Sequence, residues 1–245
     1  MILKILLPVF FLVSFNSYAF NDYEARYGLY FLGLKIAEEN RHLEVKGEII
    51  KYYSKARTKN IGKLFEDSQI EAESTLTINN NIIEPKSYTS KVYKQGKIQE
   101  VLYTEFLEKD NILIISQQKN NGKIRVYEKN YKDYLDPLSS FLVIPNKIQS
   151  NYDIGLRTFL YSDGKRIKEI KLKALNTVEE LFNKKQISLF PVEMQESKDE
   201  KITIFFAKEL NYLPFKIVKE DNGKSFEYRL EKINFLQDKT SNTYQ

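Results

Sequence analysis

The chain has 245 residues, enough for one large β domain or two small ones. Its 17 Tyr and 16 Phe can form a sizeable core although Trp is absent, and the net charge of +5 comes from interspersed Lys, Glu and Asp rather than from the concentrated basic patch of a nucleic-acid-binding protein. Cysteine is absent, which excludes disulfides, thiolate metal sites, cysteine nucleophiles and a bacterial lipoprotein anchor. His42 is the only histidine, so any Ser-His-Asp relay would have to use it.

Residues 1–19 are typical of a secretory signal peptide. A short basic start at Lys4 precedes an apolar run from Ile5 to Phe15, and small residues lead to a cleavage point after Ala19. The run has about half of the roughly 20 residues that a membrane-spanning helix needs. We therefore expect cleavage and export to the periplasm as a soluble protein without a stable membrane anchor, with a retained anchor as the alternative.

The alternation of apolar and polar residues then predicts a series of antiparallel strands. The first contains Tyr23, Ala25 and Tyr27 on one face and turns at Leu32-Gly33. Later turns contain Asn, Asp and Gly, which tolerate positive φ. The expected strands are 23–31, 34–45, 49–58, 70–78, 88–94, 97–107, 112–118, 123–129, 156–162, 166–175, 178–182 and 186–195.

One short helix interrupts the strands. Asp136 is suited to capping its first N–H groups, and Pro137 fits the first turn. Leu138, Phe141 and Leu142 are spaced to form one apolar face, which we expect to pack against an open face or end of the sheet. Pro145 is expected to end the helix.

The best-defined stretch extends from Lys201 to Leu230. Ile202, Ile204 and Phe206 share one face, and Lys208-Glu209 forms a bend. Alternation then predicts that Leu213, Phe215 and Ile217 point inward and Lys216 outward, with Pro214 at an edge, a strand start or a bulge. Asn222-Gly223 predicts a tight hairpin onto the strand that carries Phe226, Tyr228 and Leu230.

We therefore predict a mainly β fold, an antiparallel, strongly curved sheet or a barrel or half-barrel, with one short helix. The expected organisation is a signal peptide at 1–19, a single β-rich domain at 20–238 and a polar tail at 239–245. A division into two units near 146–154 is the alternative.

Several segments resemble the exported bacterial proteins grouped as domain of unknown function 3108. They are 23–37, Asp136-Pro-Leu-Ser-Ser140, Phe159-Leu-Tyr-Ser-Asp-Gly164 and, most clearly, 204–217 with its aromatic-Ala-x-x-Leu bend and Leu-Pro strand. The resemblance covers nearly all of the chain after residue 19 and implies an envelope location and a β-rich fold, without an activity. Family members often carry Trp where this chain has Phe205. The Leu-Pro pattern is also similar, more weakly, to the half-barrel carriers of lipoproteins and lipids in the periplasm.

Paired carboxylates are the main candidates for chemistry. Glu71 and Glu73 share a strand face, with Glu66 and Asp67 close in sequence, and such pairs can divide acid and base roles. The solvated face of a half-buried strand explains them better, as it does Glu179-Glu180 and Asp199-Glu200.

The other polar candidates also have structural explanations. His42 has no partner at metal-ligand spacing, and its neighbouring carboxylates suggest at most a pH-sensitive contact. Ser139 and Ser140 lack a Gly-x-Ser-x-Gly elbow and fit helix capping. No phosphate-binding or dinucleotide loop occurs. We therefore expect no catalytic residue, no cofactor and no metal.

Aromatic residues recur on the expected strands. They fill the interior if the sheet closes, or line a concave apolar surface for a lipid or acyl chain if the sheet stays open. The residues are Tyr23, Tyr27, Phe31, Tyr88, Tyr103, Phe106, Phe205 and Phe215.

The leading functional prediction is a non-enzymatic periplasmic protein of the cell envelope that binds an apolar component such as a lipid. A structural or protein-interaction module of envelope maintenance is the second hypothesis, with an envelope protein as partner. A hydrolase of polysaccharide or peptidoglycan is the third, and it requires two carboxylates in one cleft.

Overall fold

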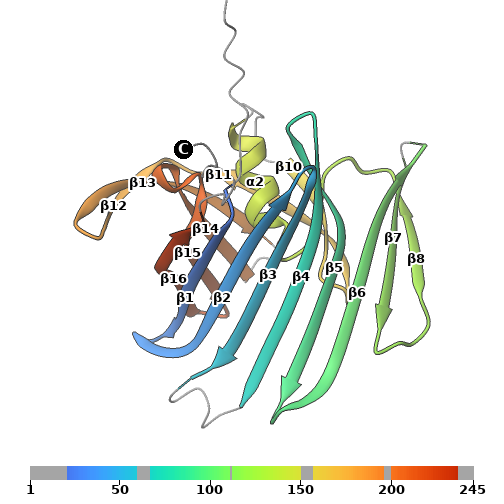
Figure 1. The fold of residues 1–245 in the computed structure, drawn as a ribbon, viewed down its shortest axis with the longest axis horizontal. Helices are drawn as coiled ribbons and strands as arrows, with labels where there is room; N and C mark the ends of the chain where they lie inside the picture. Colours follow the sequence, from blue (N-terminus) through green and yellow to red (C-terminus); the bar gives the residue numbers. More distant parts are fainter. Residues whose placement is uncertain (1–20, 60–66, 111, 150–156, 196–199, 237–245) are drawn as a thin grey trace, which may run out of the picture.

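A computed structural model describes residues 21–59, 67–110, 112–149, 157–195 and 200–236. Their strands form one 16-stranded sheet that curves strongly but does not close (Figure 1). The predicted signal peptide, the polar tail, Glu66 and Asp199 lie outside the described residues. No described helix is long and apolar enough to cross a membrane.

The sheet follows the path β8-β7-β6-β5-β4-β3-β2-β1-β16-β15-β14-β13-β11-β10-β9, and β12 pairs with β13 beside it. The pairs are antiparallel except for the short parallel pair of β9 with β10. The strands are β1 (Tyr23–Phe31), β2 (Leu34–Lys46), β3 (Ile49–Thr58), β4 (Ser68–Asn79), β5 (Ile82–Lys94), β6 (Lys97–Lys109), β7 (Ile112–Lys119), β8 (Arg125–Lys129), β9 (Tyr134–Leu135), β10 (Arg157–Ser162), β11 (Ile167–Ala174), β12 (Val178–Phe182), β13 (Lys185–Gln195), β14 (Glu200–Ala207), β15 (Leu213–Asp221) and β16 (Lys224–Phe235).

The expected strands are present, with shifted ends. The strand expected from Tyr88 begins at Ile82, because a bulge next to Pro85 lets the pairing with β4 continue. The strand expected from Lys123 begins only at Arg125. Five of the described connections are two-residue turns in which both residues have positive φ, such as Asn222 (48°) and Gly223 (75°).

The stretch from β14 to β16 confirms the predicted register. Leu213, Phe215 and Ile217 are buried, and Pro214 lies beside a bulge near the start of β15. Lys216 points to the other face, where its Nζ lies 2.6 Å from the Glu180 carboxylate and above the Phe205 ring. Lys216 is therefore half-covered rather than free in solvent.

The helix α2 (Ser140–Gln149) lies at one end of the curved sheet (Figure 1) and contacts β5 and β15. Asp136 caps its start as predicted, because the Asp136 Oδ1 atom accepts the N–H groups of Leu138 (2.9 Å) and Ser139 (2.8 Å). The prediction that Pro145 ends the helix is wrong, since α2 continues to Gln149.

Tertiary contacts hold the turn of α2 that follows Pro145. The Asn146 side chain donates to the Asn81 carbonyl at 2.9 Å and accepts the Ile83 N–H at 3.3 Å. The Lys147 ammonium lies 2.6 Å from the Asp133 carboxylate. These contacts offset the backbone hydrogen bond that proline cannot make.

Large aromatic and aliphatic side chains fill the inner face of the sheet. Tyr27, Tyr52, Phe159 and Phe206 are fully buried. Most of the aromatic residues singled out in the sequence pack inside although the sheet does not close, whereas Phe31 and Phe205 are half-buried and Tyr103 is exposed on the outer face. The five that pack inside are Tyr23, Tyr27, Tyr88, Phe106 and Phe215.

Side-chain contacts, rather than backbone pairing, join the two arms of the sheet. Gln117 on β7 donates to the Ser162 hydroxyl on β10 at 2.8 Å, and the Phe106 and Tyr134 rings stack with centroids 5.3 Å apart. The Lys165 ammonium also lies 2.5 Å from the Glu100 carboxylate. The sheet is therefore barrel-like in shape, with β8 and β9 as the ends of its path.

Candidate functional site

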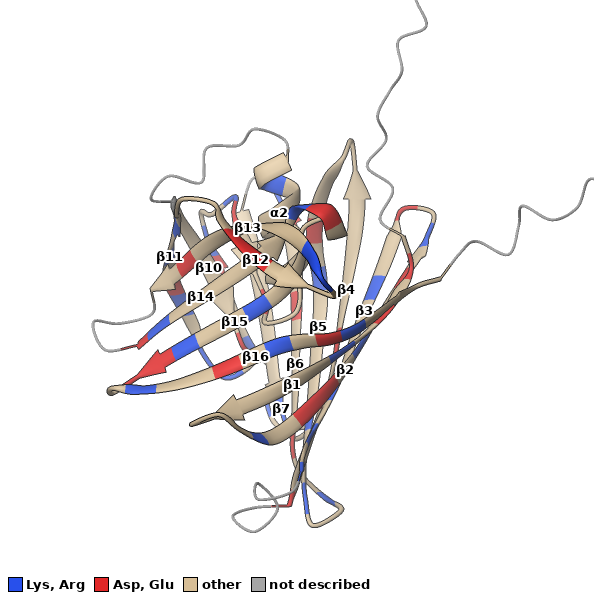
Figure 2. Ribbon diagram, turned by 90° about the vertical axis from the view of Figure 1, so that its left-hand side faces the viewer, with Lys and Arg blue, Asp and Glu red and all other residues tan. Residues whose placement is uncertain are grey.

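A groove of about 740 Å³ crosses the outer face of β16, β1, β2, β3, β4 and β5. It lies opposite the packed inner face, because its charged side chains alternate along each strand with buried residues such as Tyr23 and Tyr27 on β1. Figure 2 shows basic and acidic residues along these strands.

Strand register arranges the lining into two parallel rows of side chains. Residues two apart on one strand point to the same face about 7 Å apart, and neighbouring strands are about 4.8 Å apart. The basic row comprises Lys232, Arg26, Asn40, Lys55, Glu71 and Lys91, in order from β16 to β5. The acidic row comprises Asn234, Glu24, His42, Tyr53, Glu73 and Thr89 in the same order.

The basic row carries four cations and one carboxylate. Lys55 donates to Glu71 at 2.7 Å, and Arg26 lies 3.2 Å from Glu231 outside the groove. Among the described residues, neither Lys91 nor Lys232 forms an ion pair. The row therefore has cationic groups available to an incoming ligand.

The acidic row combines carboxylates with flat or neutral polar groups. The His42 and Tyr53 rings lie side by side with centroids 6.0 Å apart. The His42 Nδ1 atom is 3.9 Å from the Glu24 carboxylate and has no hydrogen-bond partner. Thr89 and Asn234 add hydrogen-bonding groups at the two ends of the row.

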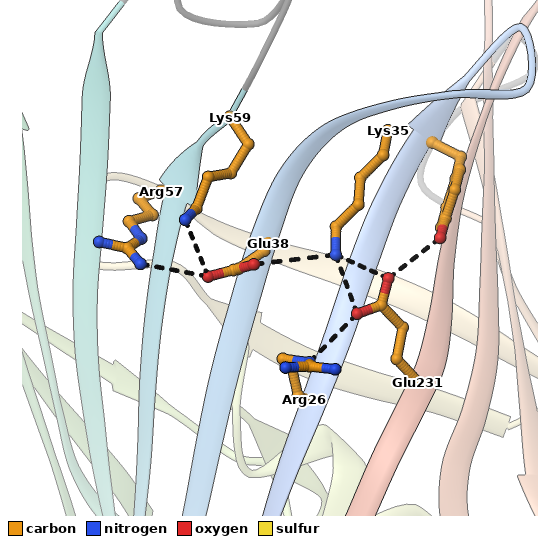
Figure 3. Close-up of polar contacts among 7 residues, drawn as sticks. Arg26, Lys35, Glu38, Arg57, Lys59 and Glu231 are labelled. Atoms are coloured by element: carbon orange, nitrogen blue, oxygen red, sulfur yellow. Dashed lines mark hydrogen bonds and ion pairs between the residues drawn. The ribbon is translucent and has the colours of Figure 1, made fainter.

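A network of ion pairs borders the groove beside the basic row (Figure 3). Glu231 accepts from Lys35 at 2.7 Å, and Glu38 lies 3.2 Å from Lys59 and 3.3 Å from Arg57. Partial burial opposes the charge on Glu38, but hydrogen bonds from Lys59 and Arg57 outweigh it and lower the pKa of that carboxyl.

A glycine makes room for this network. A Cβ atom on Gly28 would lie 2.5 Å from a Glu231 carboxylate oxygen and 2.7 Å from the Tyr30 ring. Glu231 itself occupies the bulge where the register of β1 with β16 shifts. The bordering carboxylates are thus paired and held in place, in contrast to the free lysines of the basic row.

The structure brings together candidates that the sequence offered separately. Glu71, Glu73 and His42 all line the groove. A hydrogen bond from Lys55, supported by the Tyr93 hydroxyl, lowers the pKa of Glu71, which holds this carboxyl ionised. Glu71 therefore fits a charged contact better than a proton donor. Sequence reasoning missed Arg26, Asn40, Lys91 and Lys232, because only the strand register places them in one row with Glu71.

Asp136 is a carboxyl whose pKa is raised. Burial raises this pKa to about 6, although hydrogen bonds from Ser139, Ser74 and Leu138 oppose the shift. Asp136 is fully buried at the start of α2, and the Ser74 hydroxyl lies 2.8 Å from its Oδ2 atom. Its position is on the inner side of the sheet, away from the groove, so it does not supply a proton donor there.

The remaining candidates have structural roles. Ser139 Oγ accepts the Asp136 N–H at 2.7 Å, and the Ser140 hydroxyl donates to the Pro137 carbonyl. Glu180 pairs with Lys216, and Glu200 with Lys219. Within the described ranges, no group of three His, Asp or Glu residues is placed to hold a metal ion.

Comparisons with known proteins agree with this fold. The family model described as "Protein of unknown function (DUF3108)" matches residues 22–231. A crystal structure from Brucella abortus, titled as a beta-barrel-like protein of domain of unknown function DUF1849, is similar with a TM-score of 0.61 and 9% sequence identity. The similarity covers 89% of this chain and 98% of that chain, and at this identity it bears on the fold alone. No curated protein matches the chain.

Proposed function

Because the chain belongs to the DUF3108 family, whose description assigns no activity, we propose a function from its own groove: a non-enzymatic binding protein of the bacterial cell envelope, exported to the periplasm. The observation that carries this proposal is the pair of charged rows on the outer face. The groove spans six strands of the sheet, and a ligand there meets polar side chains already placed by the strand register.

The geometry favours a polar ligand over the lipid or acyl chain of the sequence-based prediction. An apolar chain would need an unfilled apolar surface, and Tyr27, Tyr52 and Phe206 already pack against their neighbours inside. The groove instead offers ammonium, carboxylate, amide and hydroxyl groups. These groups bind other polar molecules through charge-assisted hydrogen bonds.

A non-enzymatic role is the simpler account of the carboxylates. Glycoside hydrolysis by two carboxylates needs one of them protonated near neutral pH, which requires a raised pKa. The pKa of Glu71 is lowered, and the raised pKa of Asp136 belongs to a carboxyl buried on the inner side of the sheet. Ligand binding, in contrast to hydrolysis, needs no protonated carboxyl and can use Glu71 in its ionised form.

Native mass spectrometry tests the proposal. The mature protein is incubated with a bacterial envelope extract, re-isolated and weighed. Asn40→Trp fills the groove at its centre, and the matched control Glu105→Trp places the same ring on the outer face of β6. We expect a bound species on the wild type and on Glu105→Trp, and its loss on Asn40→Trp. The same amount of bound species on all three proteins would contradict the proposal.

Export has its own test. N-terminal sequencing of the protein from a periplasmic fraction should find Phe20 as the first residue, because the segment before it has the pattern of a cleaved signal. An intact Met1 in the membrane fraction would instead support a retained anchor and would contradict the periplasmic location.

A structural or protein-interaction module is the second candidate function. The sheet path ends at β8, an edge strand, and apolar side chains of β6, β7 and β8 are exposed nearby, including Leu107, Ile112 and Val126. The positive charges of Arg125 and Lys129 on β8 disfavour non-specific pairing of this edge with strands of other molecules. Cross-linking in intact cells separates the candidates, since a scaffold gives one stable protein partner and a carrier gives transient ones.

A further inference from the structure

The turn between β1 and β2 differs from the other tight turns of the sheet. Five described two-residue turns have positive φ at both residues, and in four of them the first residue is Asn or Gln. In the β1–β2 turn this place is taken by Leu32, with φ of 50°, and Gly33 follows it. A leucine makes no local side-chain hydrogen bond in this conformation, and its Cβ atom makes the conformation unfavourable. Folding alone therefore favours asparagine at position 32.

Packing inside the protein does not explain the leucine either. The Leu32 side chain is 83% exposed, and Leu34, directly after the turn, is 53% exposed. The rings of Phe31 and Phe226 stack behind them with centroids 4.8 Å apart, because β16 pairs with β1 as far as this turn. Figure 1 shows the turn at the free end of β1 and β2, away from α2. Leu32 and Leu34 thus form a convex apolar tip on the surface.

An excess of positive charge lies behind this apolar tip. The ion-pair network of Figure 3 contains four cations and two carboxylates, an excess of two positive charges. Lys35, a member of the network, directly follows Leu34. Lys59, another member, lies beside the next residue, because its N–H donates to the Ile36 carbonyl at 2.8 Å. Ile36 is about 10 Å along the strand from the turn, which is about the range of a charge in 0.1 M salt.

We propose that this hairpin docks the protein reversibly onto an anionic membrane surface, with Leu32 and Leu34 inserted at the boundary between headgroups and acyl chains. A bilayer accepts a convex apolar tip without a complementary pocket, and its anionic headgroups complement the positive charge behind the tip. Two leucines bury too little apolar surface for permanent anchoring, so docking needs both contributions. This proposal goes beyond the binding function of the groove and does not depend on it.

Other partners fit the apolar tip less well. A stable protein interface buries about 800 Å² on each partner, far more than two leucine side chains expose. A second copy docked tip to tip would also bring two networks with excess positive charge together. Leu181 on β12 is 73% exposed and provides a comparison. Its hairpin turns at Asn183-Lys184 and carries Glu179 and Glu180, so it lacks both the apolar turn and the positive charge.

Vesicle flotation tests the proposal with the protein from Phe20 onward, since the apolar run before it would itself enter lipid. The vesicles contain equal parts of phosphatidylglycerol and phosphatidylcholine, or phosphatidylcholine alone. Leu32→Asn/Leu34→Asn removes the apolar tip, and the matched control Val178→Asn/Leu181→Asn removes two exposed aliphatic residues of β12. We expect the wild type and the control to float with anionic vesicles, and the tip variant to bind about tenfold more weakly or less. Added salt, or omission of phosphatidylglycerol, should weaken binding of the wild type.

Stability measurements separate docking from a folding defect. Because asparagine suits the left-handed conformation at position 32, Leu32→Asn alone should unfold at an equal or higher urea concentration than the wild type. The same variant should nevertheless bind anionic vesicles more weakly.

A fluorescence measurement identifies which hairpin contacts the lipid. The chain has no tryptophan, so Leu34→Trp places a single emitter at the apolar tip, and Leu181→Trp places one on β12. Brominated phosphatidylcholine in the anionic vesicles should quench the emission at position 34 and leave the emission at position 181 unchanged.

Three results would overturn the proposal. Absence of wild-type flotation with anionic vesicles would show that the protein does not dock on such a membrane. Equal flotation of the tip variant and the wild type would show that the two leucines do not contact lipid. Equal quenching at positions 34 and 181 would show that the β1–β2 hairpin is not the docking element.

Discussion

Charged residues on the inner face of β1 and β2 have a different role from charged residues on the outer face of the same strands. On the inner face, Arg41 donates to Glu39 at 2.8 and 3.0 Å, and Ser54 donates to the same carboxylate at 2.5 Å. The Arg41 guanidinium lies between the rings of Tyr27 and Phe141, at 4.4 and 4.2 Å. This pair is 4–6% exposed, whereas cations on the outer face border an open groove.

The inner charges stabilise the fold, whereas the outer charges are available to a ligand. A buried ion must be paired, because an unpaired charge in a low dielectric is strongly disfavoured. Outer cations are solvated, so leaving Lys91 and Lys232 unpaired costs little in the free protein. Variants on the inner face should therefore change stability, and variants in the groove should change binding.

The largest effect is expected for Arg41→Ala. It leaves Glu39 buried without its cation and should lower the free energy of unfolding by roughly 3–5 kcal/mol in denaturant melts. The matched outer variant Arg26→Ala breaks an ion pair whose arginine is 50% exposed, and it should cost no more than about 1 kcal/mol. The double variant Glu39→Gln/Arg41→Met should recover much of the loss, and equal effects of Arg41→Ala and Arg26→Ala would contradict the comparison.

Asp136 adds a pH dependence to the inner face. Its pKa is raised from 3.8 to about 6, so the stabilisation by its protonated form is complete below pH 3.8 and lost as the pH rises through about 6. The shift of about two units corresponds to roughly 3 kcal/mol. The stability of the wild type relative to Asp136→Asn should therefore decrease by that amount across this window in urea melts at stepped pH. A difference that is constant with pH would contradict the raised pKa.

A smaller effect is expected for Lys216→Glu. The ammonium of Lys216 lies 2.6 Å from Glu180 and 4.8 Å from the centre of the Phe205 ring, so the variant puts a second carboxylate beside Glu180. We expect a loss of about 1 kcal/mol, more than the 0.5 kcal/mol or so of an ordinary surface change. Lys216→Gln should lose less, and high salt should reduce the gap between these two variants.

The alternation of apolar and polar residues, together with the turn residues, predicts the strands and hairpins of this fold. The sequence-based predictions are wrong where long-range contacts decide the structure. Alternation placed Leu213, Phe215 and Ile217 inside because a slip by one residue would invert every side chain. It missed the buried Glu39 and Arg41, since their segment is polar on both faces and its burial depends on rings from β1 and α2.

The site was less predictable than the fold. Glu71, Glu73 and His42 were visible as polar residues on strands, but neither their companions nor a groove could be inferred. The rows form only because β16, at the end of the chain, pairs with β1 at its start. The sequence contains no turn between those two strands, so no local signal sets their register.

A tryptophan reporter tests most directly whether the groove is the binding surface. The chain has no tryptophan, so Tyr53→Trp gives a single emission signal within the groove, and Tyr103→Trp gives a matched signal on the outer face of β6. On titration with envelope extract, we predict a saturable change in emission at position 53 that Asn40→Ala weakens, and no change at position 103. An unchanged signal at position 53, or equal changes at both positions, would contradict the proposal that the outer face binds the ligand.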